Sequence, residues 1–247
     1  MSAPKAAILH LESGEVEVWL TAMAAVSEAL RSRYEQLLSA PEQIRWRRFL
    51  VEGARDQYLI ARALLRTTLS RYADAAEAAW VFETNEYGCP FVAEPAAHRD
   101  LRFNLSHTDG LVACAVTRQG EIGVDVENTD REVDPLALAP TVFAPAEVAD
   151  VAALSGEQRR QRFFSYWTLK EAYIKARGMG LSLPLDGFWF ELGGAEPRIR
   201  FTDRCPDRPE RWHFTQRQPT PNHKLALAVE TPPPKIRWRW VVPLETD

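Results

Sequence analysis

Two acidic residues alternate with apolar ones in the segment Ile122–Glu127, which reads IGVDVE. Successive side chains of a β-strand point to opposite faces, so the alternation predicts that Asp125 and Glu127 share one face with Gly123. Two carboxylates this close repel each other unless a cation or solvent offsets the charge, and a magnesium ion with phosphate ligands would do so. The alternative interpretation is an exposed strand face with ordinary surface acids.

A second charged pair lies in the segment 167–175, where Glu171 and Lys175 stand four residues apart. Apolar residues at helical spacing predict a helix over residues 157–177, and Gly178 is placed to end it. Both charged side chains would then lie on one helix face and could supply a third metal carboxylate and a cation for a phosphate. Taken alone, this spacing is better explained by a simple surface ion pair, which is common on helices.

Three strand-like runs, separated by short turns, follow one another at 101–106, 111–117 and 122–127. Connections this short favour an antiparallel meander. In a meander, His107 at the end of the first strand lies at the same end of the sheet as Asp125 and Glu127. A histidine there can reach a ligand, although a lone histidine is more often structural.

The rest of the chain must form the secondary structure that positions these segments. Residues 23–72 show helical spacing, whereas short runs between 188 and 242 read as strands punctuated by Pro and Gly. Punctuation of this kind is typical of an antiparallel sheet.

Bulk composition excludes several classes of protein. The chain has 247 residues, 46% of them hydrophobic, and a formal net charge of -4, which argues against nucleic acid as the main partner. The segment 235–240, KIRWRW, alternates basic and apolar residues, but a strand with one buried and one solvated face explains it. Residues 1–5 lack a signal-peptide pattern and no run approaches the roughly 20 apolar residues of a membrane span, so we expect a cytoplasmic protein. Three widely spaced cysteines indicate no zinc site or disulfide framework.

In order, spacing and residue type, a set of segments resembles the surfactin-type phosphopantetheinyl transferases: 104–107 (NLSH), 122–127 (IGVDVE), 163–175 (FFSYWTLKEAYIK) and 178–185 (GMGLSLPL). The resemblance implies an α+β fold of two similar halves, each a small antiparallel sheet with a long helix, with coenzyme A bound between them. It divides the chain into an N-terminal half, residues 1–120, and a C-terminal half, residues 121–247, with the magnesium and coenzyme site. The length suits this two-half type, acting as a monomer, rather than the short trimeric synthases.

The same resemblance implies transfer of 4′-phosphopantetheine from coenzyme A to a serine of an apo acyl or peptidyl carrier protein, with release of adenosine 3′,5′-bisphosphate. Asp125, Glu127 and Glu171 are implied as Mg²⁺ ligands. The implied coenzyme contacts, in chain order, are Arg48, Ser106, His107, Lys170 and Lys175. Lys175 also counts among the catalytic residues, and either Glu147 or Glu171 is implied as the general base.

One position departs from the family pattern. Cys89 stands where the family often has a lysine, so one coenzyme contact is left open. A non-catalytic protein that binds a carrier or the coenzyme is the main alternative function, and the presence of all three metal carboxylates favours the enzyme.

Overall fold

The computed structural model describes residues 8–230 and 234–245, and residues 1–5, which bear on the signal-peptide expectation, lie outside the described residues. The chain divides into two units. One comprises Met1–Glu83, Pro90–Gln119 and Lys235–Asp247, and the other comprises Thr84–Cys89 and Gly120–Pro234. The division falls close to residue 120, but the segment 84–89 belongs to the second unit and the final segment belongs to the first.

The first unit is built on a four-stranded sheet. Its strands, in spatial order, are β11 (Lys235–Trp240), β1 (Glu15–Ala22), β5 (Leu111–Thr117) and β4 (Arg102–Thr108). Strand β11 runs parallel to β1, whereas the other neighbours are antiparallel. One face of this sheet packs against helix α3 (Glu52–Ser70), whose Leu64 and Leu65 share a core with Trp19 and Cys114.

Smaller elements complete the first unit. Helices α1 (Glu28–Glu35) and α2 (Ala40–Arg47) precede α3, and a two-stranded ribbon joins β2 (Val81–Thr84) to β3 (Pro90–Glu94). Helix α2 begins with a capping box, in which the backbone N–H of Ser39 donates to Glu42 at 2.8 Å.

The basic residues of β11 are engaged in ion pairs with β1. Arg239 Nε lies 2.6 Å from Glu17 Oε2, and Lys235 and Arg237 lie 3.1 and 2.7 Å from Glu15 Oε1. The basic side chains of Lys235, Arg237 and Arg239 nevertheless stay 68%, 37% and 39% exposed, as expected for a solvated face. The predicted buried face is wrong, because Ile236 and Trp238 are only half-buried and Trp240 is 52% exposed. Nothing in this strand supports nucleic-acid binding.

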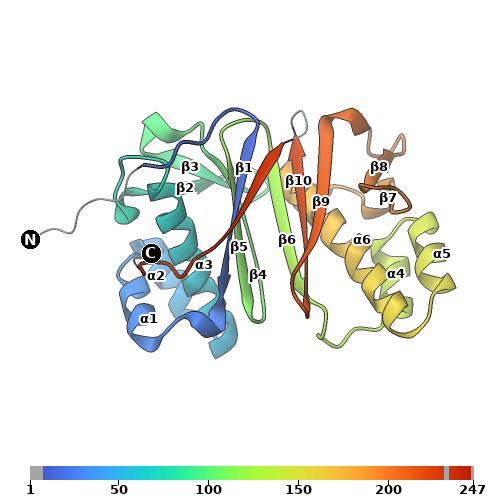
Figure 1. The fold of residues 1–247 in the computed structure, drawn as a ribbon, viewed down its shortest axis with the longest axis horizontal. Helices are drawn as coiled ribbons and strands as arrows, with labels where there is room; N and C mark the ends of the chain where they lie inside the picture. The colour runs from blue at the N-terminus through green and yellow to red at the C-terminus, as the bar shows by residue number, and fades with distance from the viewer. Residues whose placement is uncertain (1–7, 231–233, 246–247) are drawn as a thin grey trace, which may run out of the picture. The chain divides into compact units, whose positions relative to one another are not determined.

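The second unit is built on an antiparallel sheet of three strands, in the order β6 (Ile122–Asn128), β10 (His223–Glu230) and β9 (Trp212–Thr220). The long helix α6 (Gly156–Arg177) runs along this sheet (Figure 1). Helices α4 (Pro135–Val142) and α5 (Pro145–Ala153) and the ribbon of β7 (Phe188–Glu191) and β8 (Arg198–Phe201) pack around α6. The fold is α+β with small antiparallel sheets, as predicted.

The predicted three-stranded meander is wrong in its third strand. Strands β4 and β5 pair as an antiparallel hairpin, but β6 pairs with β10 in a different sheet. The reason is that β1 occupies the other edge of β5, so no edge of β5 is left for β6. His107 on β4 therefore does not share a sheet with Asp125 and Glu127 on β6.

The predicted helix over 157–177 is confirmed. Gly178 follows it in the left-handed conformation, with φ of 60°, and its N–H donates to the carbonyl of Lys175, which is a common way for a helix to end. None of the helices within residues 8–230 and 234–245 has the length and apolarity that crossing a membrane would require.

Candidate active site

Strand β6 carries its acidic residues on the face that packs against helix α6. A β-carbon at Gly123 would lie only 2.0 Å from the carbonyl oxygen of Ala172, so the helix backbone touches the strand at this glycine. Asp125 and Glu127 follow on the same face. The alternation in the sequence therefore predicted their common face correctly.

The carboxyl groups of Asp125, Glu127 and Glu171 interact electrostatically. Burial raises the pKa of Glu171, and the negative charges of Asp125 and then Glu127 raise it further. The pKa of Glu127 is raised by burial first and by the charge of Asp125 second. Like charges therefore lie close together in a partly buried site, where their repulsion destabilises the folded protein.

Neighbouring donors offset part of this repulsion. Lys175 Nζ lies 2.7 Å from Asp125 Oδ1 and donates to the carbonyl of Val124 at 3.2 Å. The indole N–H of Trp167 donates to Glu127 Oε1 at 2.7 Å, and Arg131 approaches the same oxygen at 3.5 Å. Glu171 and Lys175 face the acids of β6 from one side of α6.

The carboxylate groups of this site are chemically suited to bind a hard cation. Carboxylate oxygens are the ligands that Mg²⁺ prefers, and a divalent cation would relieve the repulsion that raises the pKa of Glu127 and Glu171. Within residues 8–230 and 234–245, however, no three His, Cys, Asp or Glu side chains stand close enough together to form a ready metal centre. The structure thus brings the expected ligands into one region without assembling a coordination shell.

Glu147 and Lys170 are both fully buried and bind each other. Lys170 Nζ lies 2.8 Å from Glu147 Oε2, and both side chains have 0% exposure. Desolvation lowers the pKa of Lys170 and raises that of Glu147, while each charge partly counteracts the shift of the other. The expected coenzyme contact of Lys170 and the expected base role of Glu147 do not fit this burial.

The remaining expected contacts belong to the first unit. His107 on β4 is exposed, and its Nδ1 lies 3.2 Å from Oε1 of Gln57 on α3. Ser106 precedes it and is only 6% exposed, because consecutive strand residues point to opposite faces. Arg48 is exposed directly after α2, and its backbone N–H donates to the carbonyl of Arg45 at 3.1 Å.

Two contacts at the site were not predicted. Trp167 lies four residues before Glu171, so the helical period that paired Glu171 with Lys175 could have found it. No helix or strand periodicity in the sequence indicates Asn85. Its Nδ2 donates to the carbonyl of Gly178 at 2.8 Å, and its Oδ1 accepts the N–H groups of Tyr87 and Cys89. These hydrogen bonds hold the turn that carries Cys89 against the C-terminal end of α6.

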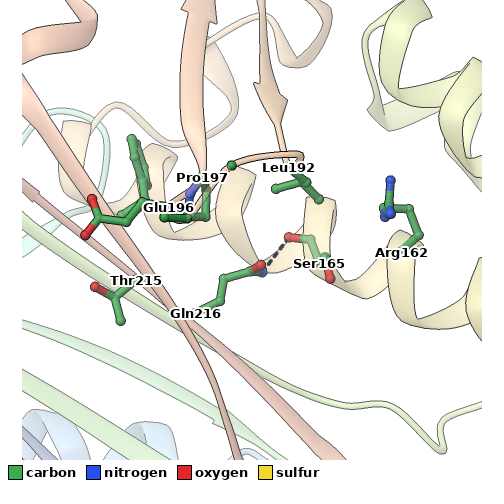
Figure 2. A pocket seen from close by; sticks show the side chains of 10 residues that line it. Arg162, Ser165, Leu192, Glu196, Pro197, Thr215 and Gln216 are labelled. Carbon is green, nitrogen blue, oxygen red and sulfur yellow. Dashed lines mark hydrogen bonds between the residues drawn. The ribbon is translucent and has the colours of Figure 1, made fainter.

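A hollow of about 510 Å³ opens between α6, β9 and the loop from β7 to β8 (Figure 2). Arg162 and Ser165 line it from the helix, and the amide of Gln216 donates to the backbone carbonyl of Ser165 at 2.9 Å. None of the expected site residues lines this hollow, so it is separate from the carboxylate group.

Two family models match the chain in succession. The model described as the 4′-phosphopantetheinyl transferase superfamily matches residues 121–229, and that described as 4′-phosphopantetheinyl transferase, N-terminal, matches residues 23–119. The first matched range contains β6 and α6, and with them Asp125, Glu127, Glu147 and Glu171.

Curated relatives match over most of the chain. The 4′-phosphopantetheinyl transferase HetI of Nostoc sp. is 34% identical over 226 residues, 92% of each chain. The 4′-phosphopantetheinyl transferase Sfp of Bacillus subtilis is 29% identical over 84% of this chain and 88% of its own. A phosphopantetheinyl transferase of Thraustochytrium sp. is 29% identical over 93% of this chain and 86% of its own.

Proposed function

Because this chain belongs to the 4′-phosphopantetheinyl transferase family, we propose that it moves the phosphopantetheine group of coenzyme A to a serine of an apo acyl or peptidyl carrier protein. One observation in the structure carries the proposal. The carboxylates of Asp125 and Glu127 on β6 face Glu171 and Lys175 on α6, an arrangement suited to a metal-bound, phosphate-bearing substrate.

The proposed reaction exchanges one phosphorus–oxygen bond for another. The serine hydroxyl oxygen bonds to the β-phosphorus of coenzyme A, the bond from that phosphorus to the bridging oxygen breaks, and adenosine 3′,5′-bisphosphate leaves. Phosphoryl chemistry of this kind depends on charge neutralisation and alignment more than on covalent help from the protein.

Asp125, Glu127 and Glu171 are the proposed Mg²⁺ ligands. When bound, the ion would supply positive charge to the pyrophosphate. Lys175 is proposed to bind a phosphate oxygen, since its ammonium group lies beside Asp125 and its side chain is 26% exposed. His107, Arg48 and Ser106 remain proposed coenzyme contacts. We propose Glu171 to take the serine proton, since both oxygens of Glu147 are engaged inside the protein.

We further propose that the enzyme acts as a monomer in the cytoplasm. Its overall charge of -4 also makes nucleic acid an unsuitable partner.

The test is the mass of a purified apo carrier protein after incubation with coenzyme A, Mg²⁺ and this protein. We expect the carrier to gain one phosphopantetheine group, and we expect the gain to stop when a chelator removes the metal. An unchanged carrier mass across several acyl and peptidyl carriers would favour the alternative of a non-catalytic binding protein.

A further inference from the structure

The ammonium group of Lys170 has all of its hydrogen-bond partners inside the second unit. Besides Glu147, it donates to the carbonyl oxygens of Leu185 at 2.7 Å and Phe188 at 2.6 Å. A lysine has three N–H donors, and the structure gives three partners. No donor is left for a phosphate oxygen, and a side chain with 0% exposure cannot reach one.

The carboxylate of Glu147 is engaged in the same way. Its Oε2 accepts the backbone N–H of Ala144 at 2.9 Å as well as the lysine, and its Oε1 accepts the backbone N–H of Phe190 at 2.9 Å. Each oxygen therefore has a protein donor. A carboxylate in this state is poorly placed to take a proton from a carrier serine, because a general base must come within hydrogen-bond reach of that proton.

The pair joins four segments of the chain. Ala144 caps the start of α5, Lys170 lies in the middle of α6, Leu185 begins the following 3-10 turn, and Phe188 and Phe190 belong to β7. Lys170 and Glu171 are consecutive residues of one rigid helix. A shift of α6 at Lys170 therefore moves the carboxylate of Glu171 relative to Asp125 on β6.

We propose that Glu147 and Lys170 are positioning residues, a buried ion pair that fixes α6 and thereby the place of Glu171, and that neither touches the coenzyme or the carrier serine. This inference rests on the proposed transferase function, which it deepens. It replaces the expectation that Lys170 binds the coenzyme and that Glu147 is a base.

Neutralising the pair one member at a time and then together tests the proposal. Lys170→Met or Glu147→Gln alone leaves one uncompensated buried charge, so each should lower the unfolding temperature and reduce kcat by about 10²-fold through misplacement of Glu171. Lys170→Met with Glu147→Gln leaves no buried charge, and the oxygen of the introduced amide can still accept one of the two backbone N–H groups, those of Ala144 and Phe190, that the carboxylate accepts. We expect the double variant to recover at least about tenfold in kcat over Lys170→Met, with the KM for coenzyme A near that of the native enzyme.

A base role for Glu147 predicts the reverse, since the double variant still lacks the carboxylate. A folded double variant no more active than Lys170→Met, or one whose KM for coenzyme A is raised about tenfold, would overturn the proposal. The matched control is Glu191→Gln, which breaks the exposed Arg200–Glu191 pair at 3.0 Å and should leave kcat within about twofold.

A measurement on the native enzyme covers the case in which the variants fail to fold. We would label lysines with acetic anhydride, with and without coenzyme A, and locate the labels by mass spectrometry. Lys170 should stay unlabelled in both samples and react only after denaturation, whereas Lys235, which is 68% exposed, should react in both. Labelling of Lys170 in the native protein would overturn the proposal. Failure of the native enzyme to modify any carrier would contradict the proposed function instead, and the labelling would still report on the pair.

Discussion

Gly123 on β6 and Ala172 on α6 are in backbone contact, since a β-carbon on the glycine would lie 2.0 Å from the carbonyl oxygen of the alanine. The backbone nitrogen of Ala176 would lie 2.5 Å away. Glu171 and Lys175 each precede one of these alanines. The absence of a side chain at residue 123 thus sets how closely the charged face of α6 approaches Asp125.

Gly123→Ala is expected to push α6 away from β6. The clash is with backbone, which cannot move aside cheaply, so the free energy of unfolding should fall by about 1–3 kcal/mol or more. Transfer should fall by about 10²-fold through misplacement of Glu171. Denaturant unfolding and the carrier mass assay measure the two effects. Gly193→Ala is the control, since a β-carbon there meets nothing within 4 Å. A Gly123→Ala enzyme with native stability and rate would refute this account of the contact.

Asp125→Asn is expected to reduce transfer by about 10²-fold or more while leaving the fold intact, because it removes one charge from the proposed metal ligands at constant size. Carrier mass against time gives the rate, and circular dichroism checks the fold. Asp186→Asn, at an exposed pair with Arg204, serves as the control and should change little. Near-normal turnover by well-folded Asp125→Asn would remove this residue from the metal site.

Glu127→Gln is expected to stabilise the metal-free protein at neutral pH. The pKa of Glu127 is raised in the folded state by burial and by Asp125, so the folded state binds the proton more tightly than the unfolded state does. This side chain therefore destabilises the native protein increasingly as pH rises through its raised pKa. The gain in unfolding temperature from Glu127→Gln should be larger at pH 8 than at pH 4.5, because the charged form that burial and Asp125 disfavour becomes more populated as pH rises. Thermal scans in a chelator test this, and a gain independent of pH would contradict it.

Trp167→Phe is expected to weaken Mg²⁺ binding without removing a ligand. The indole N–H donates to Glu127 at 2.7 Å, and such supporting contacts typically change metal affinity by about 10–100-fold. A phenyl ring keeps the stacking on Phe163 but cannot donate. The Mg²⁺ concentration for half-maximal transfer should rise, while the rate at saturating Mg²⁺ stays close to native. Trp240→Phe, at an exposed ring, is the control. An unchanged metal titration would show that this hydrogen bond does not support metal binding.

The sequence determined the features that depend on local backbone period. Alternation along Ile122–Glu127 was enough to put Asp125 and Glu127 on one face, and a spacing of four put Glu171 and Lys175 on one face of α6. The end of α6 at Gly178 was also readable, because only the local conformation of the chain is involved. The order of these motifs along the chain is also enough to indicate the family.

Tertiary structure alone decided which strands pair and which charges are buried. Strand β6 pairs with β10 because β1 already occupies the edge of β5 that a meander would need. Lys170 stands beside Glu171 in the motif, yet the packing of α5 and β7 around α6 gives its ammonium group to Glu147 and two carbonyls. Strand edges and buried partners come from segments far apart in the chain. No local period of apolar residues encodes which of these segments will meet, and packing between them makes the choice.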